Sequence, residues 1–166
     1  MRLTTLLLAV CLALPSMAQD PPKEAGKFFR VDFVVKELDD SKVISAKNYS
    51  AFTSTEGGSR GCSIRTGNRV PYQSGAGQFQ YADVGVNIDC QHTREAGGQL
   101  VLTIVADISS IPGGAEAAPN ALPTVRQNKW NSTVLIPIGK LTPLFSSDDL
   151  NSKRKMQLEV TATPVK

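Results

Sequence analysis

The chain contains one histidine, His92, and this residue limits the catalytic sites that the sequence can form. A hydrolase of the Ser-His-Asp type would have to use His92 as its general base. His92 follows a predicted strand and precedes a turn at 95–98, where an exposed, non-catalytic histidine is the simpler interpretation. We therefore predict no catalytic residues and no enzymatic activity, and a hydrolase is the least favoured function.

Two pairs of neighbouring carboxylates are the candidate metal ligands of the sequence. Asp39-Asp40 and Asp148-Asp149 carry oxygens of the kind that bind calcium, but neither pair has the ligand spacing of an EF-hand. Aspartates are also common in turns, where they bond to their own backbone. The favoured interpretation is two solvated turns, without a metal or another cofactor.

The basic residues give no strong charge signal. The net charge of the whole chain is +3, too small to indicate a nucleic-acid-binding surface. The short basic run at 153–155 could touch an anionic lipid or a partner, but a solvated turn leading into a strand is the simpler interpretation.

Trp130 is the only tryptophan of the chain and has two open interpretations. It shares strand parity with Val134, Ile136 and Ile138, which predicts that its ring packs in the core. An exposed Trp130 beside Arg126 and Lys129 would instead form a contact surface, because aromatic and basic side chains often dominate protein interfaces.

The first 18 residues predict a secretory signal peptide. Arg2 precedes the apolar run Leu6–Leu14, and small residues stand at 16 and 18. An N-terminal anchor helix is the alternative. Residues 19–27 (QDPPKEAGK) predict a flexible leader, and no later apolar stretch is long enough for a transmembrane helix.

The remaining chain, 28–166, alternates between apolar and polar residues with a period of two, which is typical of half-buried strands. The alternation predicts a hairpin over 28–52, a strand ending near Gly67-Asn68, a strand ending at Cys90 and a central strand at 100–108. Loop residues are expected at 109–123. We find no helical periodicity, so we predict one all-β domain of about eight strands, an antiparallel sandwich or open barrel.

The two cysteines that follow the predicted signal peptide are Cys62 and Cys90. If the strands on either side of the 74–77 loop form a hairpin centred on Ala76, the numbers of paired residues sum to 152. Cys62 and Cys90 then lie opposite each other, close enough for a disulfide. Two buried free thiols are the alternative.

Two short motifs on this predicted hairpin resemble the secretin domain of the outer-membrane pores of type II and type III secretion systems. The first motif lies in IRTGNRVPY (64–72) and the second in YADVGVNI (81–88). The segments at 102–111, 123–139 and 156–165 follow in the order of that family. The residues that carry the match are Gly67, Val70, Pro71, Tyr72, Tyr81, Asp83, Val84 and Gly85.

The resemblance implies a predominantly β, secretin-like fold and a role in the bacterial cell envelope. We expect an exported structural or interaction protein, in the periplasm or associated with the outer membrane, that contacts partner proteins or copies of itself. A secretion or pilus assembly is the implied setting. A β-sandwich that binds a small ligand or glycan through the 109–123 loop and Trp130 is the alternative.

Overall fold

The computed structural model describes residues 26–56, 61–73, 78–111, 124–150 and 152–165. The predicted signal peptide and most of the predicted leader lie outside the described residues, as do the 74–77 loop and residues 112–123 of the predicted 109–123 loop. Within the described ranges, no helix has the length and hydropathy needed to cross a membrane.

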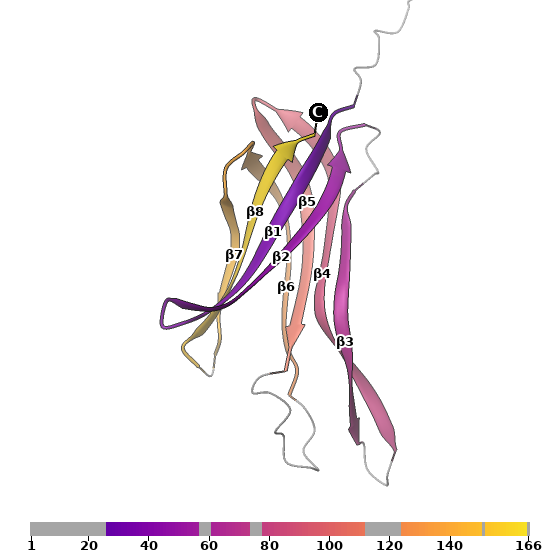
Figure 1. Cartoon of the computed structure of the whole chain (residues 1–166), viewed down its shortest axis with the longest axis vertical. Helices are drawn as coiled ribbons and strands as arrows, with labels where there is room; N and C mark the ends of the chain where they lie inside the picture. The colour runs from indigo at the N-terminus through magenta and orange to yellow at the C-terminus, as the bar shows by residue number, and fades with distance from the viewer. Residues whose placement is uncertain (1–25, 57–60, 74–77, 112–123, 151, 166) are drawn as a thin grey trace, which may run out of the picture.

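The described chain folds into eight strands and no helix, which confirms the predicted all-β class. The strands are β1 (Phe28–Asp39), β2 (Lys42–Ser54), β3 (Ser63–Gln73), β4 (Phe79–Ala96), β5 (Gln99–Ser110), β6 (Arg126–Pro137), β7 (Thr142–Asp148) and β8 (Arg154–Pro164). They form two antiparallel sheets, sheet A in the order β2-β1-β8-β7 and sheet B in the order β3-β4-β5-β6 (Figure 1). The sheets face each other as a sandwich and do not close into a barrel.

Sheet A follows from the alternation of β1. Phe29, Val31, Phe33 and Val35 are all buried, and the residues between them face outward. The β1–β2 turn is tight and uses two consecutive residues at positive φ, and a register shift between Glu37 and Leu38 separates it from the rest of the predicted hairpin. Leu158 and Val160 of β8 continue the apolar face beside β1.

Sheet B is built on β5, which pairs with β4 on one side and β6 on the other. Its even-numbered residues from Leu100 to Ile108 are buried, as the alternation predicts. Gly97 and Gly98 form the β4–β5 turn, and both have positive φ, a conformation that favours glycine. The predicted interior position of β5 is confirmed.

The structure corrects the predicted end of β3. The strand continues past Gly67-Asn68 to Gln73, so Pro71 lies inside it. Proline is tolerated there because β3 is an edge strand. The edge strands β6 and β7 also contain a proline each, Pro137 at the end of β6 and Pro143 beside a register shift between β7 and β8. The prediction of about eight strands is right, although the alternation does not reveal β7.

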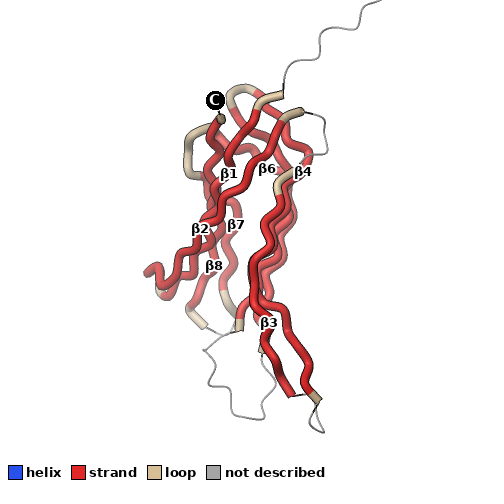
Figure 2. Tube along the Cα trace, turned by 45° about the vertical axis from the view of Figure 1, so that its right-hand side comes forward, coloured by secondary structure: helices blue, strands red, loops and turns tan. Residues whose placement is uncertain are grey.

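The β3–β4 hairpin extends beyond the sandwich (Figures 1 and 2). The pairing of β4 with β5 begins only at Val86, so Phe79–Gly85 pairs with β3 alone among the described residues. We call Gly67–Gln73 together with Phe79–Gly85 the arm.

Gly67 and Gly85 lie opposite each other at the base of the arm, where the backbones of β3 and β4 pass very close together. A Cβ atom on Gly85 would lie 2.1 Å from the carbonyl oxygen of Thr66. A larger residue at this position would therefore force the two strands apart.

Candidate functional site

All eight residues that carry the secretin-like motifs lie on the arm, in facing positions. Gly67 pairs with Gly85, Val70 with Ala82 and Pro71 with Tyr81, Asp83 and Val84 lie between these pairs, and Tyr72 follows Pro71. Two motifs that are separate in the sequence thus describe one structural element.

The outer part of the arm exposes aromatic side chains. Phe79 is 64% exposed and Tyr81 is 60% exposed. Arg69 stands over the Tyr81 ring, 5.9 Å from its centroid, and its Nε donates a hydrogen bond to Asp83 Oδ1 at 2.9 Å. These side chains lie on one face of the arm and are available for contacts outside the chain.

The backbone of β4 also presents unused hydrogen-bonding groups along the arm. The Gly85 N–H points away from β3 and donates to Ser109 Oγ at 3.0 Å. Because backbone groups alternate in direction along an antiparallel strand, the N–H groups of Phe79, Tyr81 and Asp83 point the same way. The described part of the chain supplies no strand beside them.

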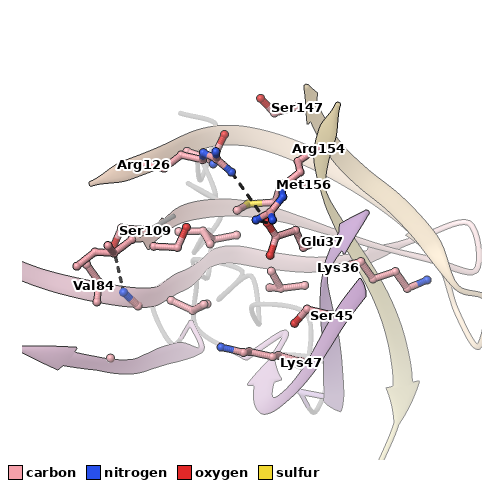
Figure 3. A pocket seen from close by; sticks show the side chains of 18 of the residues that line it. Lys36, Glu37, Ser45, Lys47, Val84, Ser109, Arg126, Ser147, Arg154 and Met156 are labelled. Atoms are coloured by element: carbon pink, nitrogen blue, oxygen red, sulfur yellow. Dashed lines mark hydrogen bonds and ion pairs between the residues drawn. The ribbon is translucent and has the colours of Figure 1, made fainter. Parts of the chain in front are cut away.

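A second feature, a cleft of about 400 Å³, lies between the two sheets at the base of the arm (Figure 3). All eight strands contribute to its walls. We call this end of the sandwich the open end, and the end with the β4–β5 and β6–β7 turns the closed end.

The cleft forms because the inward positions change from apolar to charged toward the open end. On β1, buried Val35 is followed at the next inward position by Glu37. On β8, Met156 is preceded in the same way by Arg154, and on β6 the inward parity of Trp130 reaches Arg126. Charged side chains at these positions cannot pack as a core does, and the sheets remain apart.

These charged groups form a network across the cleft. Arg126 of sheet B contacts sheet A, with Nη2 2.6 Å from Asp149 Oδ2 and Nη1 4.0 Å from Glu37 Oε1. Arg154 Nη1 lies 3.2 Å from the same Glu37 oxygen. Figure 3 shows Arg126 and Arg154 converging near Glu37.

The opposite wall of the cleft comes from β2. Ser45, Lys47 and Tyr49 share the inward parity of this strand and line the cleft. Burial raises the pKa of the half-buried Tyr49 phenol, so it remains a neutral hydrogen-bonding group. Lys47 makes no hydrogen bond or ion pair with any of the described residues, and in Figure 3 it reaches in from β2 on the side away from Arg126.

The structure does not bring Arg126, Lys129 and Trp130 together as one contact surface. Trp130 packs partly buried against the core, with its ring centroid 6.1 Å from that of Phe145, as its parity predicts. Lys129 has the opposite parity and lies on the outer face of sheet B, 3.4 Å from Asp107 Oδ2. Arg126 instead belongs to the cleft.

The other candidate residues lie apart from one another. His92 is exposed at a register shift within β4, with positive φ, and not in a turn after the strand. The predicted turns at Asp40 and Asp149 are present, and among the described residues no group of three or more His, Cys, Asp or Glu could hold a metal.

One further sequence motif is typical of a catalytic serine. The segment 57–61 spells Gly-x-Ser-x-Gly, but it connects β2 to β3. The nucleophile elbow of an α/β-hydrolase requires a strand followed by a helix, so the context of this motif is wrong.

The predicted cysteine pairing is present in the structure. Every β3–β4 pair sums to 152, and a disulfide joins Cys62 to Cys90 with a Cα–Cα distance of 4.7 Å. Both side chains are buried in the core cluster. The bond links the start of edge strand β3 to its neighbour β4.

Sequence reasoning missed Glu37 and Lys47 as cleft residues. The signal that could have found them is the strand parity itself, because both residues continue the inward positions of strands that were correctly predicted. Arg154 lies in the basic run at 153–155, where its parity with Met156 distinguishes it from the outward Lys155.

No protein-family profile matches the sequence, and no characterised protein is detectably similar to it in sequence. The fold is similar to solved secretin structures. The InvG secretin domain of the Salmonella SPI-1 injectisome has 10% sequence identity and a TM-score of 0.49, with 85% of this chain and 62% of that chain covered.

Two further secretins have comparable values. XcpQ of the Pseudomonas aeruginosa type II secretion system has 13% identity and a TM-score of 0.48, with 84% of this chain and 56% of that chain covered. GspD of enteropathogenic Escherichia coli has 12% identity and a TM-score of 0.48, with 85% and 66% covered. The chain thus spans less than two thirds of the length of these secretin chains.

Proposed function

We propose that this chain is an exported, non-enzymatic structural protein of the bacterial cell envelope that acts by protein–protein contact through its arm. The observation that carries the proposal is the edge of β4 along Phe79–Gly85, beside which the described part of the chain places no strand. The contact joins the chain to a partner protein or to another copy of itself.

The physical argument rests on the weakness of an isolated hairpin. Two strands without a third strand or a packed face are marginally stable in water. An uncovered strand edge is also a template for pairing with another chain. A partner strand beside β4 would satisfy the outward N–H groups and cover the exposed Phe79 and Tyr81 side chains.

The sequence supplies the setting for this contact. The signal peptide predicted at 1–18 supports export. The motifs that resemble the secretin domain fall on the arm, which supports a role in a secretion or pilus assembly. A location in the periplasm or at the outer membrane is part of the proposal.

The arm offers two matched variants, Asp83→Pro and Arg69→Pro. Asp83 and Arg69 face each other, so either substitution breaks their 2.9 Å ion pair. Backbone N–H groups alternate in direction along a strand, and those of Asp83 and Arg69 both point outward. Asp83→Pro therefore removes one N–H from the β4 edge, and Arg69→Pro removes one from the β3 edge.

The experiment measures assembly by light scattering of the exported protein and by crosslinking in membrane and periplasmic fractions. Asp83→Pro should weaken assembly or partner capture, whereas Arg69→Pro should retain most of it, because Pro71 already interrupts the β3 edge. A wild-type protein that stays monomeric and captures no envelope partner would overturn the proposal.

A further inference from the structure

The cleft at the open end carries charged side chains where the strand pattern calls for apolar ones. Glu37, Arg126 and Arg154 occupy inward parities of their strands and are partly buried, and the exposed Lys47 shares the inward parity of β2. Polar residues at core positions lower stability unless they serve a function, and local violations of pattern concentrate at functional sites.

Stability does not account for the charged pairs that Glu37 makes in this arrangement. The ion pairs of Glu37 with the two arginines join side chains that are about one quarter to two fifths exposed (26%, 35% and 39%). Ion pairs with such solvent access contribute little to folding. Apolar residues at the same positions would have extended the core, so the charges are better explained by something that binds them.

The cleft offers unused hydrogen-bond donors. A guanidinium has five N–H donors, and the ion pairs of Arg126 and Arg154 use only part of them. The Lys47 ammonium has no partner among the described residues. Of the described residues that line the cleft, five are cationic and three are carboxylates, which leaves two positive charges in excess.

The inner wall of the cleft is apolar. Val35, Val86, Ile108 and Met156 line it on the side toward the core. A volume of about 400 Å³ is sufficient for a small molecule, and ligand sites typically combine an apolar lining with a few polar anchors. The ligand that fits has an apolar body and an anionic head.

We propose that this cleft binds a small organic carboxylate, with the carboxylate held by Lys47 and the free N–H groups of the two arginines. The apolar body lies against Val35, Ile108 and Met156. This activity is additional to assembly through the arm, because every residue that it uses comes from one chain and none of them lies on the β4 edge of the arm.

The test uses three probes with the same eight-carbon body: octanoate, octylammonium and octanol. Binding to the whole exported chain is measured by titration calorimetry. Octanoate should bind saturably at one site and more tightly than the other two probes. Equal or tighter binding of octylammonium or octanol, or no saturable binding of octanoate, would overturn the proposal.

Lys47→Met is the diagnostic variant, because methionine keeps most of the side-chain length and removes the charge. Octanoate affinity should fall about tenfold, the usual effect of losing one hydrogen bond between charged groups. Lys42→Met is the matched control, because Lys42 lies on the same strand and is likewise exposed, but it does not line the cleft. An equal loss of affinity in the two variants would contradict the assigned site.

Asn128→Phe gives a second readout that does not remove a charge. Asn128 lines the cleft from β6, and a phenyl ring there would fill the space that the apolar body needs. The variant should lose octanoate binding and keep the oligomeric state of the wild type. The arm variant Asp83→Pro should bind octanoate normally, which separates this proposal from the proposed function.

Discussion

The two ends of the sandwich use the same strands in different ways. At the closed end, Leu100, Ile136 and Ala162 are fully buried between the sheets. Hydrogen bonds also tie the sheets together there, from the Gly139 N–H to the Ala162 carbonyl at 2.8 Å and between the Thr53 and Thr93 hydroxyls at 2.6 Å.

At the open end, the same inward parities carry Glu37, Arg126 and Arg154 around a cleft. The connection between the sheets there is an ion-pair network, with no apolar packing at these positions. From this contrast we infer that the closed end supplies most of the stability. The residues of the open end are then free to serve binding.

The largest effect should come from a cavity at the closed end. Ile136→Ala removes a fully buried side chain and should lower the free energy of unfolding by about 2–5 kcal/mol. Met156→Ala, in the partly buried wall of the cleft, should cost less because water can enter the space. Urea denaturation of both variants measures the difference, and equal losses would contradict the division into two ends.

The disulfide should rank next. Replacing both Cys62 and Cys90 by serine frees a loop with a sequence separation of 28, which should cost about 3 kcal/mol in the chain-entropy account. Thermal unfolding with and without reductant measures this loss. Reductant should destabilise the wild type and leave the double variant unchanged.

Changing the open end to resemble the closed end should have a smaller effect. The double variant Glu37→Leu/Arg154→Leu replaces an ion pair by apolar side chains at inward positions, and its free energy of unfolding should stay within about 1 kcal/mol of the wild type. The single variant Glu37→Leu is the control, and it should be less stable than the double variant because it leaves the arginines without that carboxylate. A double variant that fails to fold would show that the network is structural.

The smallest effect concerns an ion pair on the outer face of sheet B, away from both ends. Two hydrogen bonds from Arg65 Nη2, at 2.7 and 2.8 Å, lower the pKa of the Asp89 carboxyl below its ordinary value of 3.8. A lowered folded-state pKa stabilises the protein above the unfolded-state pKa, and this contribution disappears as the pH falls through the folded-state value.

Asp89→Asn should therefore be slightly less stable than the wild type at neutral pH and equally stable in strong acid. Urea denaturation across this pH range measures the change. Arg65→Gln should show the same loss of pH dependence, and a difference that persists in strong acid would point to a packing effect.

The sequence could predict the features that depend on one strand or one hairpin. Alternation identified the buried face of β1 and β5, and the sum of residue numbers placed Cys62 opposite Cys90. These features follow from the two-residue period of a strand and from the register of a single turn.

The cleft and β7 could not be predicted in the same way. The cleft depends on which strands of the two sheets face each other, because Arg126 and Glu37 are 89 positions apart and meet only across the sandwich. Pro143 and the adjacent register shift interrupt the alternation of β7, so its residues show no clear period.

Pro71 gives the arm a direction. The N–H of Gly85 points away from β3, and because facing residues of an antiparallel pair orient their backbone groups alike, the N–H of its partner Gly67 points away from β4. Pro71 has the same parity as Gly67, so the nitrogen of Pro71 also faces the outer edge of β3. A strand added on that side would meet a position without a donor, whereas a strand added beside β4 would find the outward N–H groups of Phe79, Tyr81 and Asp83. The two sides of the arm are therefore unequal, so any assembly that grows by strand addition would extend toward one side and not toward both.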